Sequence, residues 1–208
     1  MPKKKLGILL SGRGSNFEAI ADNAEKEVLD AEIAIVISNV ADARGLEVAR
    51  RRNLNACFVD PRGKSREEYD REVVALLTKS KVDLICLAGY MRILSPYFIQ
   101  QFPSRILNIH PALLPAFKGL DAQKQALEYG VKVTGCTVHF VDEGVDSGPI
   151  VLQATVPVEE GDTEELLARR ILREEHRLYS KAIALVLEGL CEVEGRSVHI
   201  HSSSVNAD

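Results

Sequence analysis

The run Arg-Ile-Leu-Asn-Ile-His at residues 105–110 contains the residues best suited to chemistry in this sequence. Side chains alternate along a strand, so Asn108 and His110 share one face of the predicted strand. Pro111 follows directly and ends that strand. An amide can donate a hydrogen bond to a developing oxyanion, and an imidazole can donate one or relay a proton. We therefore predict that Asn108 and His110 are catalytic; the structural alternative is an Asn that braces a loop beside a hydrogen-bonded His.

The loop at residues 141–149 adds carboxylates to this pair. Asp146 lies between two nearby glycines, a setting that suits a carboxylate presented on a tight loop. Beside His110, such a carboxylate would favour the protonated imidazole and make it a better acid. Asp142, Glu143 and Asp146 lack the spacing of a calcium-binding loop, so we predict no metal site.

A third candidate is the segment Ser-Gly-Arg-Gly-Ser-Asn at residues 11–16, between the first predicted strand and the first predicted helix. Glycines let a ligand come close to the backbone, and a helix start offers free N–H groups to an anion. The dinucleotide-binding fingerprint needs a glycine at position 17, where this chain has Phe17. We predict that Gly14, Ser15 and Asn16 hold a single phosphate group. The alternative is a tight turn in which Ser15 or Asn16 caps the helix.

Alternating apolar runs and helical patterns must position these candidates. The repeated strand–helix order predicts right-handed crossovers and an α/β fold, a mostly parallel twisted sheet of about seven strands with helices on both faces. A strand–loop–strand arrangement near the end predicts antiparallel strands at one edge of the sheet. The predicted strands are 6–10, 33–38, 56–59, 82–88, 105–110, 133–140 and 149–156, and the predicted helices are 16–29, 44–53, 66–79, 96–102, 121–129 and 163–187.

The composition limits the class of protein. The 208 residues include 26 Lys and Arg against 30 Asp and Glu, and the net charge is −4. A chain without a basic surface is a poor nucleic-acid binder, and the sequence contains no apolar run of the ~18 residues that a membrane span needs. Four widely spaced cysteines predict buried thiols in a reducing compartment, and the apolar run at residues 6–10 is too short for a secretion signal. We therefore expect a cytoplasmic protein with neither a nucleic-acid nor a membrane partner.

Three motifs in this order resemble the folate-dependent formyltransferase family. Residues 108–115 read Asn-Ile-His-Pro-Ala-Leu-Leu-Pro, and residues 135–150 read Gly-x-Thr-Val-His-Phe-Val-x-Glu-x-x-Asp-x-Gly-Pro-Ile, in line with the active-site pattern of that family. The segment Ser-Gly-x-Gly-Ser-Asn at residues 11–16 completes the match, which extends over about residues 6–190. The resemblance implies a Rossmann-like formyltransferase fold.

The resemblance also implies a reaction. A formyl group would pass from the co-substrate 10-formyltetrahydrofolate to the amine of N1-(5-phosphoribosyl)glycinamide (glycinamide ribonucleotide), in purine biosynthesis. The amine would attack directly, through a tetrahedral intermediate and without a metal. Two sister possibilities remain, transfer to another acceptor or hydrolysis, and a non-catalytic phosphate-binding module is the alternative from another class.

Residue roles follow from the same resemblance. It implies that Asn108, His110 and Asp146 are catalytic, that Gly14, Ser15 and Asn16 hold the substrate phosphate, that Glu175 steadies the amine end of the substrate, and that Thr137 and His139 support the catalytic residues. It implies a folate site formed by Arg66, Met91, Arg92, Ile93, Leu94, Asn108, Val141, Asp142, Glu143 and Asp146. Asp121 stands where relatives often have His, which leaves two alternatives for its side chain, a ligand contact or a helix N-cap.

The length bears on the domain organisation that we expect. Relatives that formylate initiator methionyl-tRNA carry an added RNA-binding domain, and formyltetrahydrofolate hydrolases carry an added amino-terminal domain. A chain of 208 residues favours neither. We expect one domain over residues 1–190, with phosphate binding in its first half and folate binding and catalysis in its second. Residues 191–208 would form a polar, flexible tail, and the protein would be a monomer or a homodimer.

Overall fold

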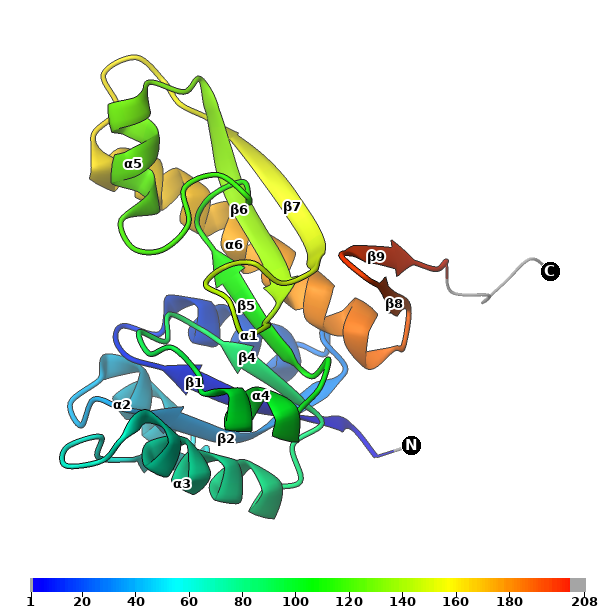
Figure 1. Ribbon diagram of the computed structural model, residues 1–208. Helices are drawn as coiled ribbons and strands as arrows, with labels where there is room; N and C mark the ends of the chain where they lie inside the picture. Colours follow the sequence, from blue (N-terminus) through cyan, green and yellow to red (C-terminus); the bar gives the residue numbers. More distant parts are fainter. Residues whose placement is uncertain (1, 203–208) are drawn as a thin grey trace.

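Seven strands form a twisted sheet in the order β3-β2-β1-β4-β5-β6-β7 in the computed structural model, which describes residues 2–202 (Figure 1). Strands β1 to β5 are parallel, whereas β6 pairs antiparallel with β5 and β7 pairs antiparallel with β6. The predicted α/β class and its antiparallel edge are therefore confirmed. The strands are β1 (Lys4–Leu10), β2 (Ala31–Ser38), β3 (Ala56–Phe58), β4 (Leu84–Leu87), β5 (Ile106–His110), β6 (Val133–Phe140) and β7 (Ile150–Pro157).

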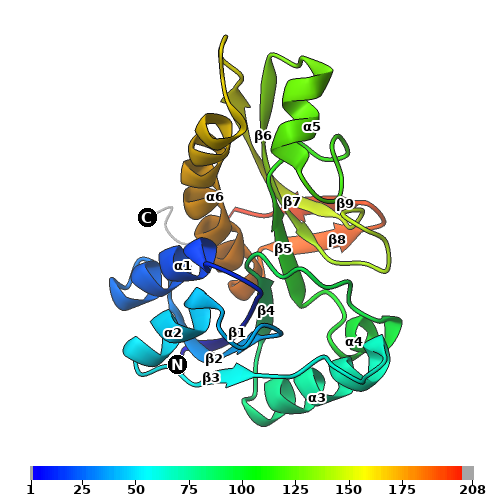
Figure 2. The same ribbon diagram turned by 90° about the vertical axis from the view of Figure 1, so that its left-hand side faces the viewer.

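Helices cover both faces of this sheet. On one face, α1, α2 and α6 enclose a core with alternate strand side chains such as Leu6 and Ile8. On the other face, α3 and α4 pack against the intervening side chains, among them Leu9 and Ile85 (Figure 2). The helices are α1 (Ser15–Glu25), α2 (Arg44–Arg51), α3 (Arg66–Lys79), α4 (Pro96–Gln101), α5 (Ala122–Tyr129) and α6 (Glu164–Leu187). Within residues 2–202, none of the helices is both long and apolar enough to cross a membrane.

The helix starts differ in a way that matters for ligand binding. Ser65 and Glu68 form a capping box at the start of α3, with each side chain bound to the backbone N–H of the other residue. Ser95 likewise accepts a hydrogen bond from the Phe98 N–H at the start of α4. At α1 the cap position is occupied by Gly14, whose hydrogen side chain can cap nothing. The first N–H groups of α1 are thus left for another partner.

The antiparallel junction between β5 and β6 brings the predicted catalytic residues together. Asn108 of β5 lies opposite His139 of β6, and His110 lies opposite Thr137. Because β6 runs against β5, its following loop begins beside the start of β5, where the Val141 N–H donates to the Ile106 carbonyl. The loop at residues 141–149 must fold back along β5 to reach His110.

A second, two-stranded sheet follows α6, where the sequence analysis expected an irregular tail. Strands β8 (Cys191–Glu194) and β9 (Ser197–Ile200) pair antiparallel, and the turn residue Arg196 donates a hydrogen bond to the Ser147 carbonyl at 2.9 Å. Apolar and polar residues alternate along both strands, a period of two that supports a hairpin despite the polar composition. The expectation of a flexible tail is wrong for 191–200, and residues 203–208 lie outside the described part of the chain.

Candidate active site

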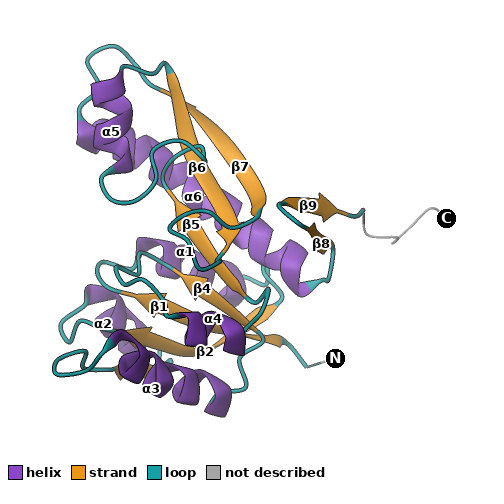
Figure 3. Ribbon diagram, in the orientation of Figure 1, coloured by secondary structure: helices purple, strands orange, loops and turns teal. Residues whose placement is uncertain are grey.

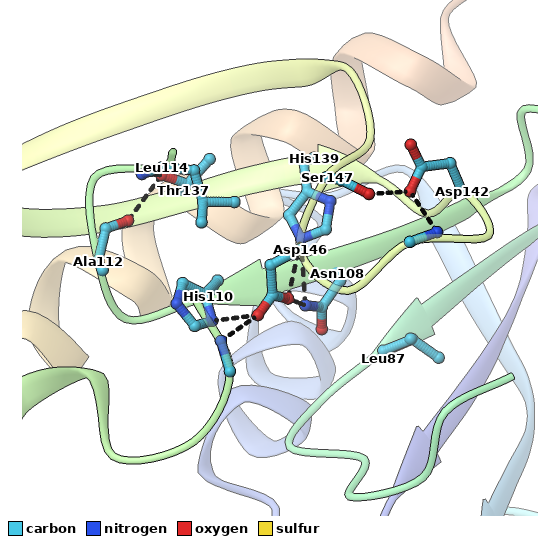
Figure 4. A network of polar contacts seen from close by, with 12 residues as sticks. Leu87, Asn108, His110, Ala112, Leu114, Thr137, His139, Asp142, Asp146 and Ser147 are labelled. Atoms are coloured by element: carbon cyan, nitrogen blue, oxygen red, sulfur yellow. Dashed lines mark hydrogen bonds and ion pairs between the residues drawn. The ribbon is translucent and has the colours of Figure 1, made fainter. Parts of the chain in front are cut away.

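Asp146 lies at the centre of a polar cluster that joins three segments of the chain (Figure 4). Its Oδ2 atom accepts a hydrogen bond from the Gly119 N–H at 2.8 Å and lies 3.3 Å from His110 Nδ1. Its Oδ1 atom lies 3.4 Å from Asn108 Nδ2 and 3.7 Å from His139 Nε2. The structure therefore brings together Asn108, His110 and Asp146, as the sequence predicts.

The two histidines of the cluster are each fixed by a main-chain carbonyl. His110 Nε2 lies 2.7 Å from the Phe117 carbonyl, and His139 Nδ1 lies 2.8 Å from the Phe140 carbonyl. A carbonyl can only accept a hydrogen bond, so each of these ring nitrogens carries a proton. In the neutral rings, His110 Nδ1 is then unprotonated and faces Asp146, whereas His139 Nε2 accepts from Asn108 Nδ2 at 3.2 Å.

Opposing effects act on the protonation of His110 and Asp146. Burial lowers the pKa of His110 from its ordinary value of 6.5, and this effect outweighs the opposing influence of the Phe117 carbonyl and the Asp146 carboxylate. The Asp146 carboxylate therefore acts on His110 in the predicted direction, because its charge favours the protonated imidazole, while burial opposes it. Burial acts to raise the pKa of Asp146, but the contact with the His139 ring and the hydrogen bond from the Gly119 N–H hold that pKa below its ordinary value. Burial and the neighbouring groups thus act in opposite directions on both residues.

The loop that carries Asp146 is shaped by its own residues. Asp142 Oδ1 accepts hydrogen bonds from the Ser147 hydroxyl at 2.6 Å and from the Gly144 N–H at 3.1 Å. A Cβ atom added at Gly148 would lie 1.8 Å from the Phe140 carbonyl oxygen, so only glycine fits there. Asp146 itself has a φ of 46°, a left-handed conformation that an Asp adopts more readily than most residues. These features turn the loop back so that the Asp146 carboxylate meets His110.

Thr137 and the turn after β5 support the cluster from behind. The Thr137 hydroxyl is fully buried, donates to the Ala112 carbonyl at 2.7 Å and accepts from the Leu114 N–H at 3.1 Å. It thereby ties β6 to the Pro-rich segment that continues to Phe117 and Gly119. The backbone groups of Phe117 and Gly119 were missed by the sequence reasoning, because a carbonyl or an N–H leaves no mark on residue type.

A cavity of about 580 Å³ opens beside the cluster. It is lined by residues 89–94, 108–111, 119–123, 141–142 and 144–146, together with Leu87 and His139. Eight of the predicted folate residues belong to this lining: Met91, Arg92, Ile93, Leu94, Asn108, Val141, Asp142 and Asp146. Arg66 and Glu143, both exposed, lie outside it. A wider hollow of about 820 Å³ lies at the edge of β2, lined by other residues than the cluster.

The predicted phosphate segment stands at the start of α1. The first helical hydrogen bond runs from the Glu18 N–H to the Gly14 carbonyl, so the N–H groups of Ser15, Asn16 and Phe17 precede it. Gly14 is the cap residue, and the alternative in which Ser15 or Asn16 caps the helix is wrong. Gly14 has a φ of 77°, and a Cβ atom there would lie 2.9 Å from Gly45 Cα, so packing also requires this glycine.

Glu175 joins this segment from α6. Asn16 Nδ2 donates to Glu175 Oε2 at 2.8 Å, across 159 residues of sequence. Glu175 is buried, which raises the pKa of its carboxyl group. The Asn16 Oδ1 atom is also buried and has no hydrogen-bond partner within the described residues. The pair thus offers a ligand one unsatisfied acceptor beside the free N–H groups of α1.

Two further sequence expectations concern helix capping and metal binding. Asp121 stands at the cap position of α5, but its φ of 56° turns it away from the capping conformation and its side chain caps nothing. The capping alternative is therefore wrong. Among residues 2–202, no three or more His, Cys, Asp and Glu side chains gather in a way that could hold a metal ion.

Comparison with known proteins places this geometry in a family. A model of the formyl transferase family matches residues 4–183. The chain belongs to the formyl transferase family. The resemblance inferred from three short motifs is thereby confirmed, and the match covers every residue of the Asp146 cluster.

Individual relatives also carry the names of formyl transferases or of a purine biosynthetic protein. The chain is 42% identical to phosphoribosylglycinamide formyltransferase of Escherichia coli, over 88% of this chain and 86% of that protein. It is 47% identical to the trifunctional purine biosynthetic protein adenosine-3 of Gallus gallus over 92% of this chain, and it spans 19% of the length of that relative. The solved structure of glycinamide ribonucleotide transformylase 1 from Symbiobacterium toebii superposes with a TM-score of 0.95 at 54% identity, covering 96% of this chain and 95% of the other.

Proposed function

We propose that this chain transfers the formyl group of 10-formyltetrahydrofolate to the amine of N1-(5-phosphoribosyl)glycinamide, a step of purine biosynthesis. The proposal depends above all on the Asp146 cluster, which presents a base, an amide donor and an imidazole at the wall of a cavity. The Escherichia coli relative named phosphoribosylglycinamide formyltransferase, 86% of which this chain covers, supports this choice of acceptor. In this proposal the partners are small molecules, the compartment is the cytoplasm, and the active species is a monomer or a homodimer.

The proposed chemistry assigns one task to each catalytic residue. As the amine adds to the formyl carbon, the formyl oxygen gains negative charge, and the Asn108 amide donates to it. The Asn108–Asp146 contact of 3.4 Å is long for a hydrogen bond, so the substrate oxygen can replace it at little cost. Loss of one such donor typically costs ~10²–10³ in turnover.

Proton transfer falls to Asp146 and His110. The amine loses one proton as its new C–N bond forms, and the folate nitrogen gains one as the old C–N bond breaks. Asp146, ionised at rest, accepts the first proton directly or through a water and returns it to the leaving nitrogen. His110 Nδ1 lies 3.3 Å from the same carboxylate, and an imidazolium formed there during the reaction is stabilised by it.

Binding roles divide between the two ends of the site. The free N–H groups of Ser15 and Asn16 suit a terminal phosphate, and Glu175 suits the amine end of the same substrate. The folate donor suits the cavity, where Met91 and Ile93 are 64% and 54% exposed and offer apolar surface to a flat ring. Arg66 lies outside the cavity lining, so in this proposal it contacts only the distal tail of the donor.

A direct assay tests the proposal. Purified protein is incubated with both substrates in the presence of EDTA, and the formylated nucleotide and tetrahydrofolate are quantified. We expect both products in equal amounts. Release of formate without an acceptor would favour a hydrolase, and the absence of turnover with both substrates would overturn the proposal.

A further inference from the structure

Asp70 is a buried carboxylate that the proposed chemistry does not use. It lies on α3 with 1% of its surface exposed, and its Oδ2 atom accepts a hydrogen bond from the Ser95 N–H at 2.6 Å. Burial raises the pKa of this carboxyl group, while the Ser95 hydrogen bonds and the charge of Arg92 oppose that rise. A buried carboxylate is costly unless it is well paired, so its presence behind the cavity calls for a role.

Asp70 binds one end of the segment at residues 88–95. This segment connects β4 to α4 without regular secondary structure (Figure 3). Its residues 89–94 line one wall of the 580 Å³ cavity. At its start, the Ser11 N–H donates to the Gly89 carbonyl and the Met91 N–H donates to Ser11 Oγ. Its far end is fixed by the Asp70 contact with Ser95.

Tyr69, the neighbour of Asp70, holds the middle of the same segment. The Tyr90 hydroxyl donates to the Tyr69 hydroxyl at 3.3 Å, and both side chains are buried. The Arg92 guanidinium lies 4.2 Å from the centre of the Tyr69 ring, in a cation–π geometry. Two consecutive residues of α3 thus contact the segment at three positions, 90, 92 and 95.

We infer that Tyr69 and Asp70 are positioning residues that fix the shape of segment 88–95 and so set the affinity for the folate donor. The inference rests on the proposed function for the identity of that donor. An irregular segment without these contacts samples many conformations, and the apparent dissociation constant rises by the inverse of the competent fraction. Ser11, which precedes the substrate phosphate site at α1, bonds Gly89 and Met91 at the start of the segment, whereas Asp70 holds its far end. We therefore expect loss of the Asp70 contact to weaken binding of the donor more than binding of the phosphorylated substrate.

Kinetics of Asp70 variants test this inference. For Asp70→Ala we expect the KM for 10-formyltetrahydrofolate to rise about tenfold, while the KM for the phosphorylated substrate stays within about twofold. Asp70→Asn should restore most of the donor affinity, because its amide oxygen can still accept from the Ser95 N–H. Tyr69→Phe keeps the ring and loses only the hydroxyl contact, so we expect the KM for 10-formyltetrahydrofolate to rise about threefold. This variant tests the inference if Asp70→Ala fails to fold.

Leu77→Val provides the matched control for a merely structural effect. Leu77 is fully buried on the same helix, about two turns beyond Asp70, and packs towards Gly7 of β1. We expect this variant to lower the melting temperature and leave both KM values unchanged. If Asp70→Ala and Tyr69→Phe also leave the donor KM unchanged, the inference is overturned while wild-type turnover still supports the proposed function.

Equilibrium binding separates this inference from the proposed function. Calorimetric titration of each variant with tetrahydrofolate measures affinity for the folate without any turnover. Weaker binding in Asp70→Ala and Tyr69→Phe than in Leu77→Val supports the inference even if the acceptor differs from the one proposed. Equal affinities in Asp70→Ala, Tyr69→Phe and Leu77→Val would refute it.

Discussion

Replacing Asp146 by Asn removes one negative charge from the catalytic cluster while preserving its shape. The amide oxygen can take the place of Oδ2, keep the 2.8 Å hydrogen bond from the Gly119 N–H and remain 3.3 Å from His110 Nδ1. Asn also tolerates the φ of 46° at this position. We therefore expect Asp146→Asn to change the free energy of unfolding by no more than about 1 kcal/mol.

The expected loss of activity is far larger than this change in stability. A neutral acceptor in place of a charged one weakens a hydrogen bond by about 1–1.5 kcal/mol, which corresponds to roughly tenfold in rate. Loss of a positioned proton acceptor costs ~10²–10⁴. Together they predict a fall in kcat of about 10³-fold or more, with little change in the KM for the phosphorylated substrate, because Ser15, Asn16 and Glu175 are untouched.

Steady-state kinetics over a range of pH measure this effect. The part of the wild-type acid limb that reflects ionisation of Asp146 should vanish in Asp146→Asn. Glu160→Gln, an exposed carboxylate that no proposed role involves and that lies outside the cavity lining, is the control and should keep wild-type rates. A kcat for Asp146→Asn within about threefold of wild type would refute the assignment of Asp146 as the proton acceptor.

Further predictions concern pH and packing. Burial lowers the pKa of His110, so below about pH 6.5 the unfolded chain binds a proton more readily than the folded chain does. We therefore expect the free energy of unfolding to fall as the pH drops below about 6.5. Urea melts at several pH values should show a smaller fall in His110→Gln than in the wild type. Burial raises the pKa of Glu175, so the free energy of unfolding should fall as the pH rises above about 4.5. In thermal melts, Glu175→Gln should lose less stability over this pH range than the wild type. The same variant should raise the KM for the phosphorylated substrate about tenfold. Gly148→Ala would place its Cβ 1.8 Å from the Phe140 carbonyl and should cost several kcal/mol in urea melts, whereas Gly12→Ala has open space and should be neutral.

The fold was predictable wherever the sequence pattern is local. The expected helix at 66–79 coincides with α3 at both ends. Its start is visible in the sequence because Ser65 and Glu68 have the spacing of a capping box. The first helix was predicted to reach residue 29 but ends at Glu25, and Glu27 then takes a left-handed φ of 59°. The sequence has no glycine or proline near residue 25 to mark the end of the helix. The apolar residues Val28 and Leu29 continue the helical spacing, so the predicted helix was too long. Periodicity alone could not detect this stop.

The candidate site was predictable where side-chain chemistry carries the role. Asn108, His110 and Asp146 follow from residue type and strand alternation. The backbone groups of Phe117 and Gly119 leave no trace in residue type, and the protonation of His110 depends on burial, which a sequence does not measure. Asp70 was missed for a related reason. Its spacing on α3 is that of an ordinary helix residue, and only the packing of α3 against segment 88–95 gives it a partner.

The sequence separation within the catalytic cluster has a consequence for how the chain acquires its structure. The contacts of Asp146 and His139 span 27, 38 and 31 residues, and the contact between Asn16 and Glu175 spans 159. Contacts so distant along the chain close large loops and therefore form late. The helices α1 to α3 can form from local contacts before β6 docks on β5. We expect refolding chains to regain helical signal before enzymatic activity, which makes activity a late reporter of folding in this protein.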